Sequence, residues 1–245
     1  MSNQPWFLVP LGSLGAGEVT LPPDESRHAL KVLRVAPPDV ITVTDGAGTV
    51  ARCAASRVEG GSLIAEILES ELRRPLLPEV VVYQGAAKGG KVDDVVERLA
   101  EMGVAETTVF ASERSVVRWD QAKAARLAER WGAIARSTAK QSRSPFVMRT
   151  DQPLSWERML ARVANEQATV VLWEGASLPL RTALHGPPDR IALVVGPEGG
   201  FAREEAEALA DAGGQLVSLG PRILRTENAP IVSVAAVLYH YGLIG

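Results

Sequence analysis

Hydrophobic and polar positions alternate over short stretches in the first part of the chain, as they do in half-buried β-strands. Residues 41–44 (Ile-Thr-Val-Thr) alternate strictly and stop at Asp45-Gly46, a dipeptide that favours a tight turn. Two further stretches of this kind cover residues 50–58 and 63–68. The pattern therefore predicts a small antiparallel sheet or barrel over residues 1–72.

The pattern changes after residues 73–78, a segment with two prolines that we interpret as a linker. Short apolar runs now alternate with stretches in which apolar residues recur at helical spacing, and the clearest of these helices stops at Gly103. Such alternation predicts an α/β domain over residues 79–245, with a mostly parallel sheet that helices cover on both faces. The predicted strands are 80–83, 107–110, 169–173, 191–195 and 216–219, and the predicted helices are 92–102, 121–141, 203–212 and 230–241.

Composition narrows the possible functions. The chain has 245 residues, 46% of them hydrophobic, which is enough for one large or two modest packed domains. Its formal net charge is −3, so the molecule as a whole is no polycation. Any contact with a nucleic acid must therefore come from local basic patches.

Neither metal chemistry nor a membrane location is indicated. Cys53 is the only cysteine, and His28, His185 and His240 lie far apart without the spacing of metal ligands. We therefore expect no metal and no disulfide. No apolar run approaches the length that spans a bilayer, and the N-terminus lacks the pattern of a signal peptide. A soluble cytoplasmic protein is the expectation.

The first candidate loop, Gly196-Pro197-Glu198-Gly199-Gly200-Phe201, follows a predicted strand and precedes a predicted helix. Gly199 and Gly200 permit positive φ angles and the close approach of a ligand to the backbone. The spacing fits neither the dinucleotide fingerprint nor the phosphate-binding loop of nucleotide hydrolases. By itself the loop fits a plain strand-to-helix turn better than a ligand site.

The second candidate loop covers residues 219–228, between the last predicted strand and the last predicted helix. It contains two apolar residues, Ile223 and Leu224, which could form the wall of a pocket for an aromatic ring. Arg225 and Glu227 lie beside the helix N-terminus, where Asn228 is a candidate N-cap. An alternative interpretation is that Glu227 complements the helix dipole and Arg225 merely pairs with it.

A third strand end, Leu172-Trp173-Glu174-Gly175, adds an acidic residue and a glycine. Ligands of open α/β sheets bind where the carboxyl ends of the strands meet. We therefore expect the three loops to converge on one pocket. They offer backbone amides, glycines and an Arg/Glu pair, which favours binding and group transfer over hydrolysis by a nucleophile or metal cluster.

Basic residues gather in local sets. Arg27, Lys31 and Arg34 have the spacing of one helical face, which predicts a stripe that contacts phosphates or, alternatively, an ordinary solvated face. The charged residues within 114–149 are mostly basic, nine against two acidic, and Lys88 lies in another strand-to-helix loop. An RNA-sized surface could draw on all of these sets.

Taken together, these segments resemble the RsmE family of 16S ribosomal RNA uridine-N3 methyltransferases, which belongs to the SPOUT (trefoil-knot) superfamily. The resemblance extends over nearly the whole chain, with the segments in family order. It departs from the family pattern at Glu227-Asn228-Ala229, where the family usually has Glu-Thr-Ala, and at Lys140. The matching segments are 27–34, Lys88 with 101–104, 112–115, 141–143, 196–201 and 219–227.

The resemblance implies an α/β SPOUT domain with a trefoil knot, preceded by a PUA-like β-barrel domain that binds RNA. It also implies S-adenosylmethionine as methyl donor, 16S ribosomal RNA in the small ribosomal subunit as partner, and a homodimer. The RNA contacts would come from Arg27, Lys31, Arg34, Lys88 and Arg114. The donor would bind at Leu172, Glu174, Gly196, Glu198, Gly199, Gly200, Leu219, Gly220, Ile223 and Leu224.

Methyl transfer to uracil N3 requires the loss of a proton from a weakly acidic imide. Glu227 is the candidate base and Arg225 the candidate cation for the resulting anion, with Glu198 as an alternative carboxylate. Two other functions remain open at this stage. One is a ribose 2′-O-methyltransferase of the same superfamily, and the other is a non-catalytic RNA-binding protein.

Overall fold

The structure, a computed structural model, describes residues 4–15, 17–112, 115 and 119–245. It divides the chain into two compact units, one made of Met1–Pro75 and Arg136–Val147 and the other of Leu76–Ala135 and Met148–Gly245. The division near residue 75 falls inside the segment interpreted as a linker. The return of residues 136–147 to the first unit was not expected from the sequence.

The first unit is built on a five-stranded sheet with the order β1-β3-β4-β5-β2. The three strands expected from the sequence, β3, β4 and β5, pair antiparallel, as does β2 with β5, whereas the unpredicted β1 pairs parallel with β3. Phe7, Ile41, Val43 and Leu63 are fully buried in its core. The strands are β1 (Trp6–Leu8), β2 (Glu18–Thr20), β3 (Val40–Thr44), β4 (Thr49–Glu59) and β5 (Ser62–Leu72).

The segment 136–147 belongs to this unit because its side chains pack against a turn of the sheet. An added Cβ at Gly48 would lie 2.9 Å from the Phe146 ring, and one at Gly46 would lie 2.8 Å from Val147. The Val147 amide also donates a hydrogen bond to the carbonyl of Gly46 at 2.9 Å. These contacts join residues about a hundred positions apart in sequence, which no local pattern reveals.

The predicted basic helical face in this unit is partly wrong. Arg27 ends a short helix, α1 (Pro23–Arg27), and Lys31 lies in the π-helical turn η1 (His28–Val32), while Arg34 lies beyond both with a φ of 57°. The wider turn changes the spacing on which a shared face depends, because a π-turn closes five residues back rather than four. Arg27, Lys31 and Arg34 are nevertheless all exposed.

The second unit contains a six-stranded sheet with the order β11-β9-β10-β6-β7-β8, and every neighbouring pair in it is parallel. This confirms the predicted α/β fold class with its parallel sheet after a smaller β-rich unit. The strands are β6 (Glu79–Gly85), β7 (Glu106–Phe110), β8 (Arg149–Thr150), β9 (Thr169–Leu172), β10 (Arg190–Val195) and β11 (Gly214–Val217).

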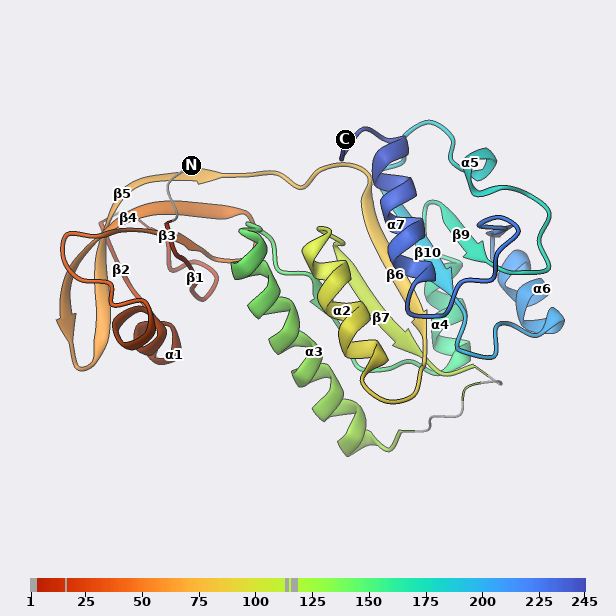
Figure 1. Ribbon diagram of the computed structural model, residues 1–245, viewed down its shortest axis with the longest axis horizontal. Coiled ribbons are helices and arrows are strands. Elements are labelled where there is room, and N and C mark those ends of the chain that lie inside the picture. The colour runs from red at the N-terminus through yellow and green to blue at the C-terminus, as the bar shows by residue number, and fades with distance from the viewer. Residues whose placement is uncertain (1–3, 16, 113–114, 116–118) are drawn as a thin grey trace. The chain divides into compact units, whose positions relative to one another are not determined.

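Helices cover both faces of this sheet. Figure 1 shows α2 and α7 in front of the strands and α4 behind them. On the rear face, Met159 of α4 and Leu209 of α6 are buried against Val81 and Val171 of the sheet. The helices are α2 (Lys91–Glu101), α3 (Gln121–Ser142), α4 (Trp156–Val163), α5 (Leu180–Ala183), α6 (Arg203–Asp211) and α7 (Ala229–His240).

Three elements of the second unit were not predicted, namely α4, α5 and β8. The last two have only four and two residues, too few for a periodic signal. The helix α4 has eight residues, and the Ser155 hydroxyl caps it by accepting a hydrogen bond from the Arg158 amide. Within the described residues, no helix has both the length and the apolar character needed to cross a membrane.

Candidate functional site

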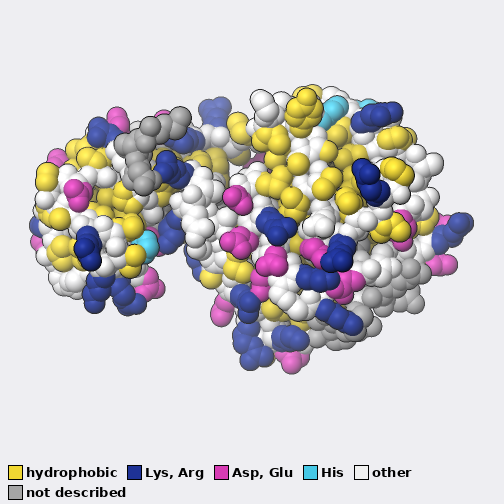
Figure 2. All heavy atoms as spheres, viewed as in Figure 1, with side chains coloured by type: hydrophobic (Ala, Val, Ile, Leu, Met, Phe, Trp, Pro, Cys, Tyr) yellow, Lys and Arg dark blue, Asp and Glu magenta, His cyan; other side chains and the backbone are white. Residues whose placement is uncertain are grey.

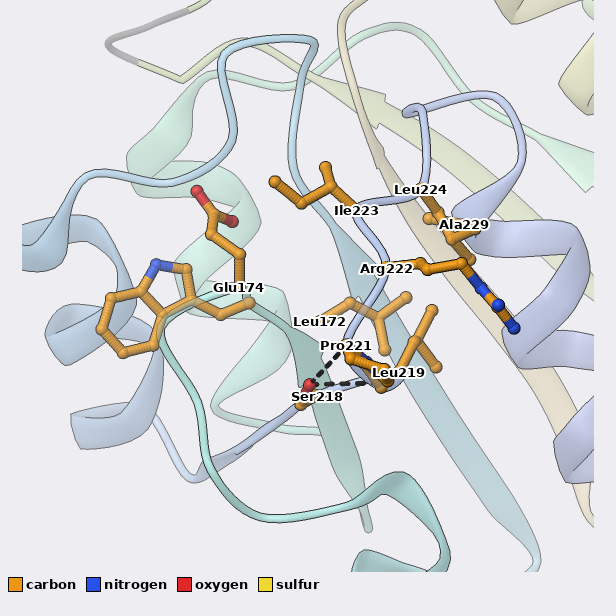
Figure 3. A pocket seen from close by; sticks show the side chains of 11 residues that line it. Leu172, Glu174, Ser218, Leu219, Pro221, Arg222, Ile223, Leu224 and Ala229 are labelled. Atoms are coloured by element: carbon orange, nitrogen blue, oxygen red, sulfur yellow. Dashed lines mark hydrogen bonds between the residues drawn. The ribbon is translucent and has the colours of Figure 1, made fainter.

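A cavity of about 580 Å³ lies at the carboxyl ends of β9 and β11 (Figure 3). This volume is within the range of about 300–1,000 Å³ that is usual for small-molecule sites. Its position is the one expected for a ligand of a parallel sheet. The cavity is lined by Leu172, Trp173, Glu174, Ser218, Leu219, Gly220, Pro221, Arg222, Ile223, Leu224 and Ala229.

The loop before α7 forms one wall of the cavity. The Ser218 hydroxyl accepts a hydrogen bond from the Gly220 amide at 3.2 Å, and Gly220 has a φ of 111°, which favours glycine. Ile223 is 88% exposed although it is a large apolar residue. In Figure 3 the Ile223 side chain extends toward Glu174, whereas Arg222 extends away from it. An exposed apolar side chain at the mouth of a cavity can pack against the ring of an aromatic ligand.

The loop after β10 lies directly against Glu174. Gly200 has a φ of 67°, and an added Cβ there would lie 2.7 Å from Glu174 Oε1. Only this glycine of the Gly199-Gly200 pair adopts a positive φ. The loop ends at Phe201, whose ring stacks on Phe110 in the core and anchors the turn.

A buried hydrogen-bond chain ties the loop before α7 to the centre of the sheet. Gln84 Nε2 donates to Thr226 Oγ1 at 2.9 Å, and the Thr226 hydroxyl donates to the Gly196 carbonyl at 2.7 Å. Gln84 Oε1 is buried and has no hydrogen-bond partner among the described residues. An added Cβ at Gly85 would lie 2.3 Å from the Pro197 nitrogen, so the backbones touch here. The chain fixes where the segment 219–228 passes the sheet.

Beside these loops, one lysine brings two carboxylates together. Lys91 Nζ, at the start of α2, donates a hydrogen bond to Glu198 Oε1 at 2.6 Å and lies 3.6 Å from Glu227 Oε2. We call these three residues the Lys91 cluster. The hydrogen bond from Lys91 lowers the pKa of Glu198, and the same bond raises the pKa of Lys91. Glu227 Oε2 is buried and accepts no hydrogen bond from any described group.

Arg225 does not form the ion pair with Glu227 that the sequence suggested as one interpretation. Its side chain is exposed, and among the described residues no ion pair joins it to Glu227. Its carbonyl instead accepts hydrogen bonds from the amides of Asn228 and Ala229 at 2.8 and 3.0 Å, which shape the turn into α7. Asn228 occupies the N-cap position, as expected, although its side chain makes no capping hydrogen bond.

The structure brings most of the predicted donor residues together. Six line the cavity, and Gly200 lies behind Glu174, while Gly196, Glu198 and Gly199 belong to the loop beside it. Lys88 is exposed in the loop before α2, and Arg114 lies outside the described residues. The six lining residues are Leu172, Glu174, Leu219, Gly220, Ile223 and Leu224.

Sequence reasoning missed several residues here. Trp173, Pro221 and Arg222 line the cavity from within the candidate loops but were not among the predicted donor contacts, and Ser218 lies one residue before the second loop. Little in the sequence indicates that Lys91 contacts the two carboxylates, because it is one of two lysines that flank Gly89-Gly90.

The opposite edge of the same sheet carries a network of paired charges around a second cavity of about 680 Å³. Glu106 accepts hydrogen bonds from Arg149, Arg162 and Arg190 at 3.2, 3.1 and 2.9 Å. Glu166 accepts one from the Tyr83 hydroxyl at 2.6 Å. Within the described part of the chain, no group of three or more His, Cys, Asp or Glu residues could hold a metal ion.

Comparison with known proteins identifies the family. An RNA methyltransferase domain family matches residues 74–238, and an RNA methyltransferase PUA domain family matches residues 21–68. The ribosomal RNA small subunit methyltransferase E of Mycobacterium bovis is 35% identical over 218 residues, which cover 87% of this chain and 83% of that protein. The chain belongs to the ribosomal RNA small subunit methyltransferase E family.

Other members of this family agree. The methyltransferase E of Bacillus subtilis is 31% identical over 229 residues and covers 90% of each chain. A crystal structure of the methyltransferase E from Neisseria gonorrhoeae, bound to S-adenosyl methionine, superposes with a TM-score of 0.86 at 31% identity. It covers 97% of this chain and 98% of that one. The resemblance of the sequence to the RsmE family, with its SPOUT and PUA-like domains, is thereby confirmed.

Proposed function

We propose that this protein transfers a methyl group from S-adenosylmethionine to N3 of a uridine in the 16S ribosomal RNA of the small ribosomal subunit. The observation that carries the proposal is the meeting of the predicted donor loops around one cavity, next to the Lys91 cluster. The membership of this chain in the methyltransferase E family supports the same reaction. In this proposal residues 1–72 form the RNA-binding domain and residues 79–245 the methyltransferase domain.

The volume and the lining residues of the cavity suit S-adenosylmethionine. Leu172, Leu219 and Ile223 offer apolar surface for an adenine ring, and the Glu174 carboxylate offers acceptors for the ribose hydroxyls. Glycines at 199, 200 and 220 let backbone amides approach a ligand closely. When bound, this donor supplies an already activated methyl group, so the protein's part is to align donor and acceptor.

On the acceptor side, the chain must remove a proton from uracil N3. In the proposed reaction Glu227 accepts this proton while N3 forms a bond to the methyl carbon and the carbon–sulfur bond of the donor breaks. Glu198 is the alternative acceptor. Arg225, which is exposed in the isolated chain, is the candidate cation for the uracil oxygens. N3 belongs to the Watson–Crick edge, so the target base must be unpaired or flipped out.

Contacts with RNA are proposed at exposed basic residues of both units. Arg27, Lys31 and Arg34 surround the π-helical turn of the first unit, and Lys88 lies beside the Lys91 cluster. Arg114 completes the proposed set. Such contacts with phosphates position an RNA without reading its sequence. Action on a ribosomal subunit also implies a cytoplasmic location.

A homodimer is part of the same proposal, and α7 supports it. Val232 and Tyr239 lie on the side of α7 that is not buried in the chain. Their exposed fractions are 45% and 73%. Figure 2 shows hydrophobic side chains gathered over the region of α7. A second copy of the chain is the occupant that would cover this face. Sedimentation of the native protein should give a dimer, and Tyr239→Glu should shift it to monomer, whereas a native monomer would refute the dimer.

The reaction itself is tested with labelled S-adenosylmethionine and small ribosomal subunits that lack the modification. Nuclease digestion and mass spectrometry of the nucleosides should yield N3-methyluridine at one position. A methylated ribose would assign the chain to 2′-O-methylation instead. RNA binding without any methyl transfer would overturn the proposed activity.

A further inference from the structure

Lys91, at the start of α2, lies between two carboxylates of the proposed site. Its ammonium contacts Glu198 at 2.6 Å and lies 3.6 Å from Glu227, although these carboxylates come from different loops. One precedes α6 and the other precedes α7. Among the described residues, Lys91 is therefore the one cation in contact with both carboxylates.

The surroundings of Glu227 make this cation important. The Glu227 side chain is only 20% exposed, and its Oε2 atom is buried without a hydrogen bond to any described group. A buried carboxylate oxygen left without a donor costs free energy unless a ligand or a nearby charge compensates it. Among the described residues, the compensating positive charge is the Lys91 ammonium, at a distance too long for a direct hydrogen bond.

Lys91 is itself held in place by the backbone. The Lys88-Gly89-Gly90 turn places it at the first position of α2, and Gly89 has a φ of 68°. Val92, Val95 and Val96 then bury the helix against its neighbours, so its start cannot move freely. The charged groups that face the ammonium are Glu198 and Glu227, and Lys88 adds its positive charge next to Glu198.

We propose that Lys91 is a positioning residue for methyl transfer, which holds Glu198 as a fixed anchor and thereby orients the Glu227 carboxylate toward the uracil. This inference rests on the proposed function. In it Glu198 serves the site through its bond to Lys91, and Glu227 keeps one oxygen free to accept the N3 proton. The alternative is that Lys91 only binds RNA phosphate together with Lys88.

A double-mutant cycle separates the two roles. Lys91→Met should lower kcat by about 100-fold, the size seen when one aligned group is lost from a polar active site. In a Glu227→Gln background the same change should lower kcat by less than about twofold, because its effect passes through Glu227. Independent, multiplying losses would overturn the proposal. A rise in KM alone, with a weaker salt dependence, would indicate a phosphate contact instead.

The pH profile adds a readout that a merely structural defect would not change. Without an oriented base, the uracil must lose its proton to solvent, so kcat of Lys91→Met should keep rising with pH after the wild-type curve has levelled off. Lys91→Arg, which keeps the charge, should restore part of kcat. A loss that is equal at every pH, with no rescue by arginine, would contradict the positioning role.

A measurement on the protein without donor or RNA tests the contact directly. Carboxyl NMR titration, assigned with Glu198→Gln, should show the pKa of Glu198 rising in Lys91→Met, because the hydrogen bond that lowers it is removed. Arg98→Met, which removes a cation from the exposed side of the same helix, is the matched control and should leave that pKa unchanged. An unchanged pKa of Glu198 in Lys91→Met would refute the contact.

Failure of this inference differs from failure of the proposed function. If the wild-type protein does not methylate small subunits, the proposed function is wrong whatever Lys91 does. If the wild type is active and Lys91→Met matches it in kcat and pH profile, only the inference is wrong.

Discussion

The two edges of the six-stranded sheet differ in how their polar groups are satisfied. At the amino edge, Glu106 accepts hydrogen bonds from three arginines and Glu166 accepts them from Tyr83 and Arg190. At the carboxyl edge, Gln84 Oε1 and Glu227 Oε2 are buried without hydrogen-bond partners among the described residues, whereas at the amino edge the Thr169 hydroxyl is the one such group. Backbone at this edge also adopts positive φ angles, as at Gly200.

We interpret this difference as that between a structural region and the proposed functional site. Buried polar groups are nearly always paired, and the exceptions concentrate where a ligand completes them. At the amino edge, burial and the hydrogen bond to Glu166 raise the pKa of Tyr83, which keeps its hydroxyl protonated as a donor. The charges there neutralise one another. In the proposed assignment, therefore, the fully paired charges of the amino edge are structural, and the incompletely paired Glu227 belongs to the functional site.

The largest expected effect is at the carboxyl edge. Glu227→Gln should lower methyl transfer by at least about 100-fold, because it removes the proposed base while keeping the size of the side chain. Arg225→Ala should also reduce turnover, with donor affinity unchanged in both. Single-turnover assays with small subunits measure the loss. Near-normal turnover in both variants would contradict their assignment.

At the amino edge the expected effect is on stability. Glu106→Ala leaves three arginines without their shared partner and should lower the free energy of unfolding by about 2 kcal/mol, a discounted value because Arg149 is 66% exposed. Thermal denaturation should show Tm lower by about 4–8 °C. Donor affinity of the folded variant should match the wild type, and a large loss of affinity would extend the site to this edge.

A smaller effect is expected from two matched glycine substitutions. Gly200 and Gly103 have φ angles of 67° and 79°, so an alanine at either position costs about 1–2 kcal/mol of backbone strain. Only at Gly200 does the new methyl group meet a site residue, Glu174, while nothing lies within 4 Å at Gly103. Calorimetry should show weaker donor binding for Gly200→Ala alone, and equal affinities would remove Gly200 from the donor site.

The smallest expected effect is a pH dependence of stability. Because Lys91 lowers the pKa of Glu198 below its ordinary value of 4.5, their interaction stabilises the folded state at neutral pH and is lost as the pH falls through the lowered pKa. The difference in Tm between wild type and Lys91→Met should therefore shrink as the pH falls from 7 to below 4.5. A difference that grows on acidification would contradict this sign.

The sequence predicted the architecture where the signal is local. Alternation over residues 41–44 and helical spacing from Val92 to Leu99 depend on neighbours a few residues apart, and both elements are present. The strand-end loops could also be predicted, since a parallel sheet brings carboxyl ends to one edge. The π-helical turn at residues 28–32 could not, because a wider turn has no distinct pattern of its own.

Contacts between charged residues that are far apart in the sequence could not be predicted from local patterns. Sequence proximity suggested pairing Arg225 with Glu227, whereas the folded chain places Lys91 near Glu227 and bonds it to Glu198, 107 residues away. The choice depends on where the Gln84–Thr226–Gly196 hydrogen-bond chain holds the last loop. Contacts of this kind follow from the three-dimensional path of the chain and leave no periodic signal.

The contrast between the two edges is tested most directly by a crystal structure of this protein with S-adenosylhomocysteine. We predict the ligand at the carboxyl edge, with its adenine beside Leu172, Leu219 and Ile223 and its sulfur on the side of the Lys91 cluster. A ligand bound in the cavity around Glu106 and Arg190, or one that leaves the carboxyl-edge cavity empty, would contradict the account.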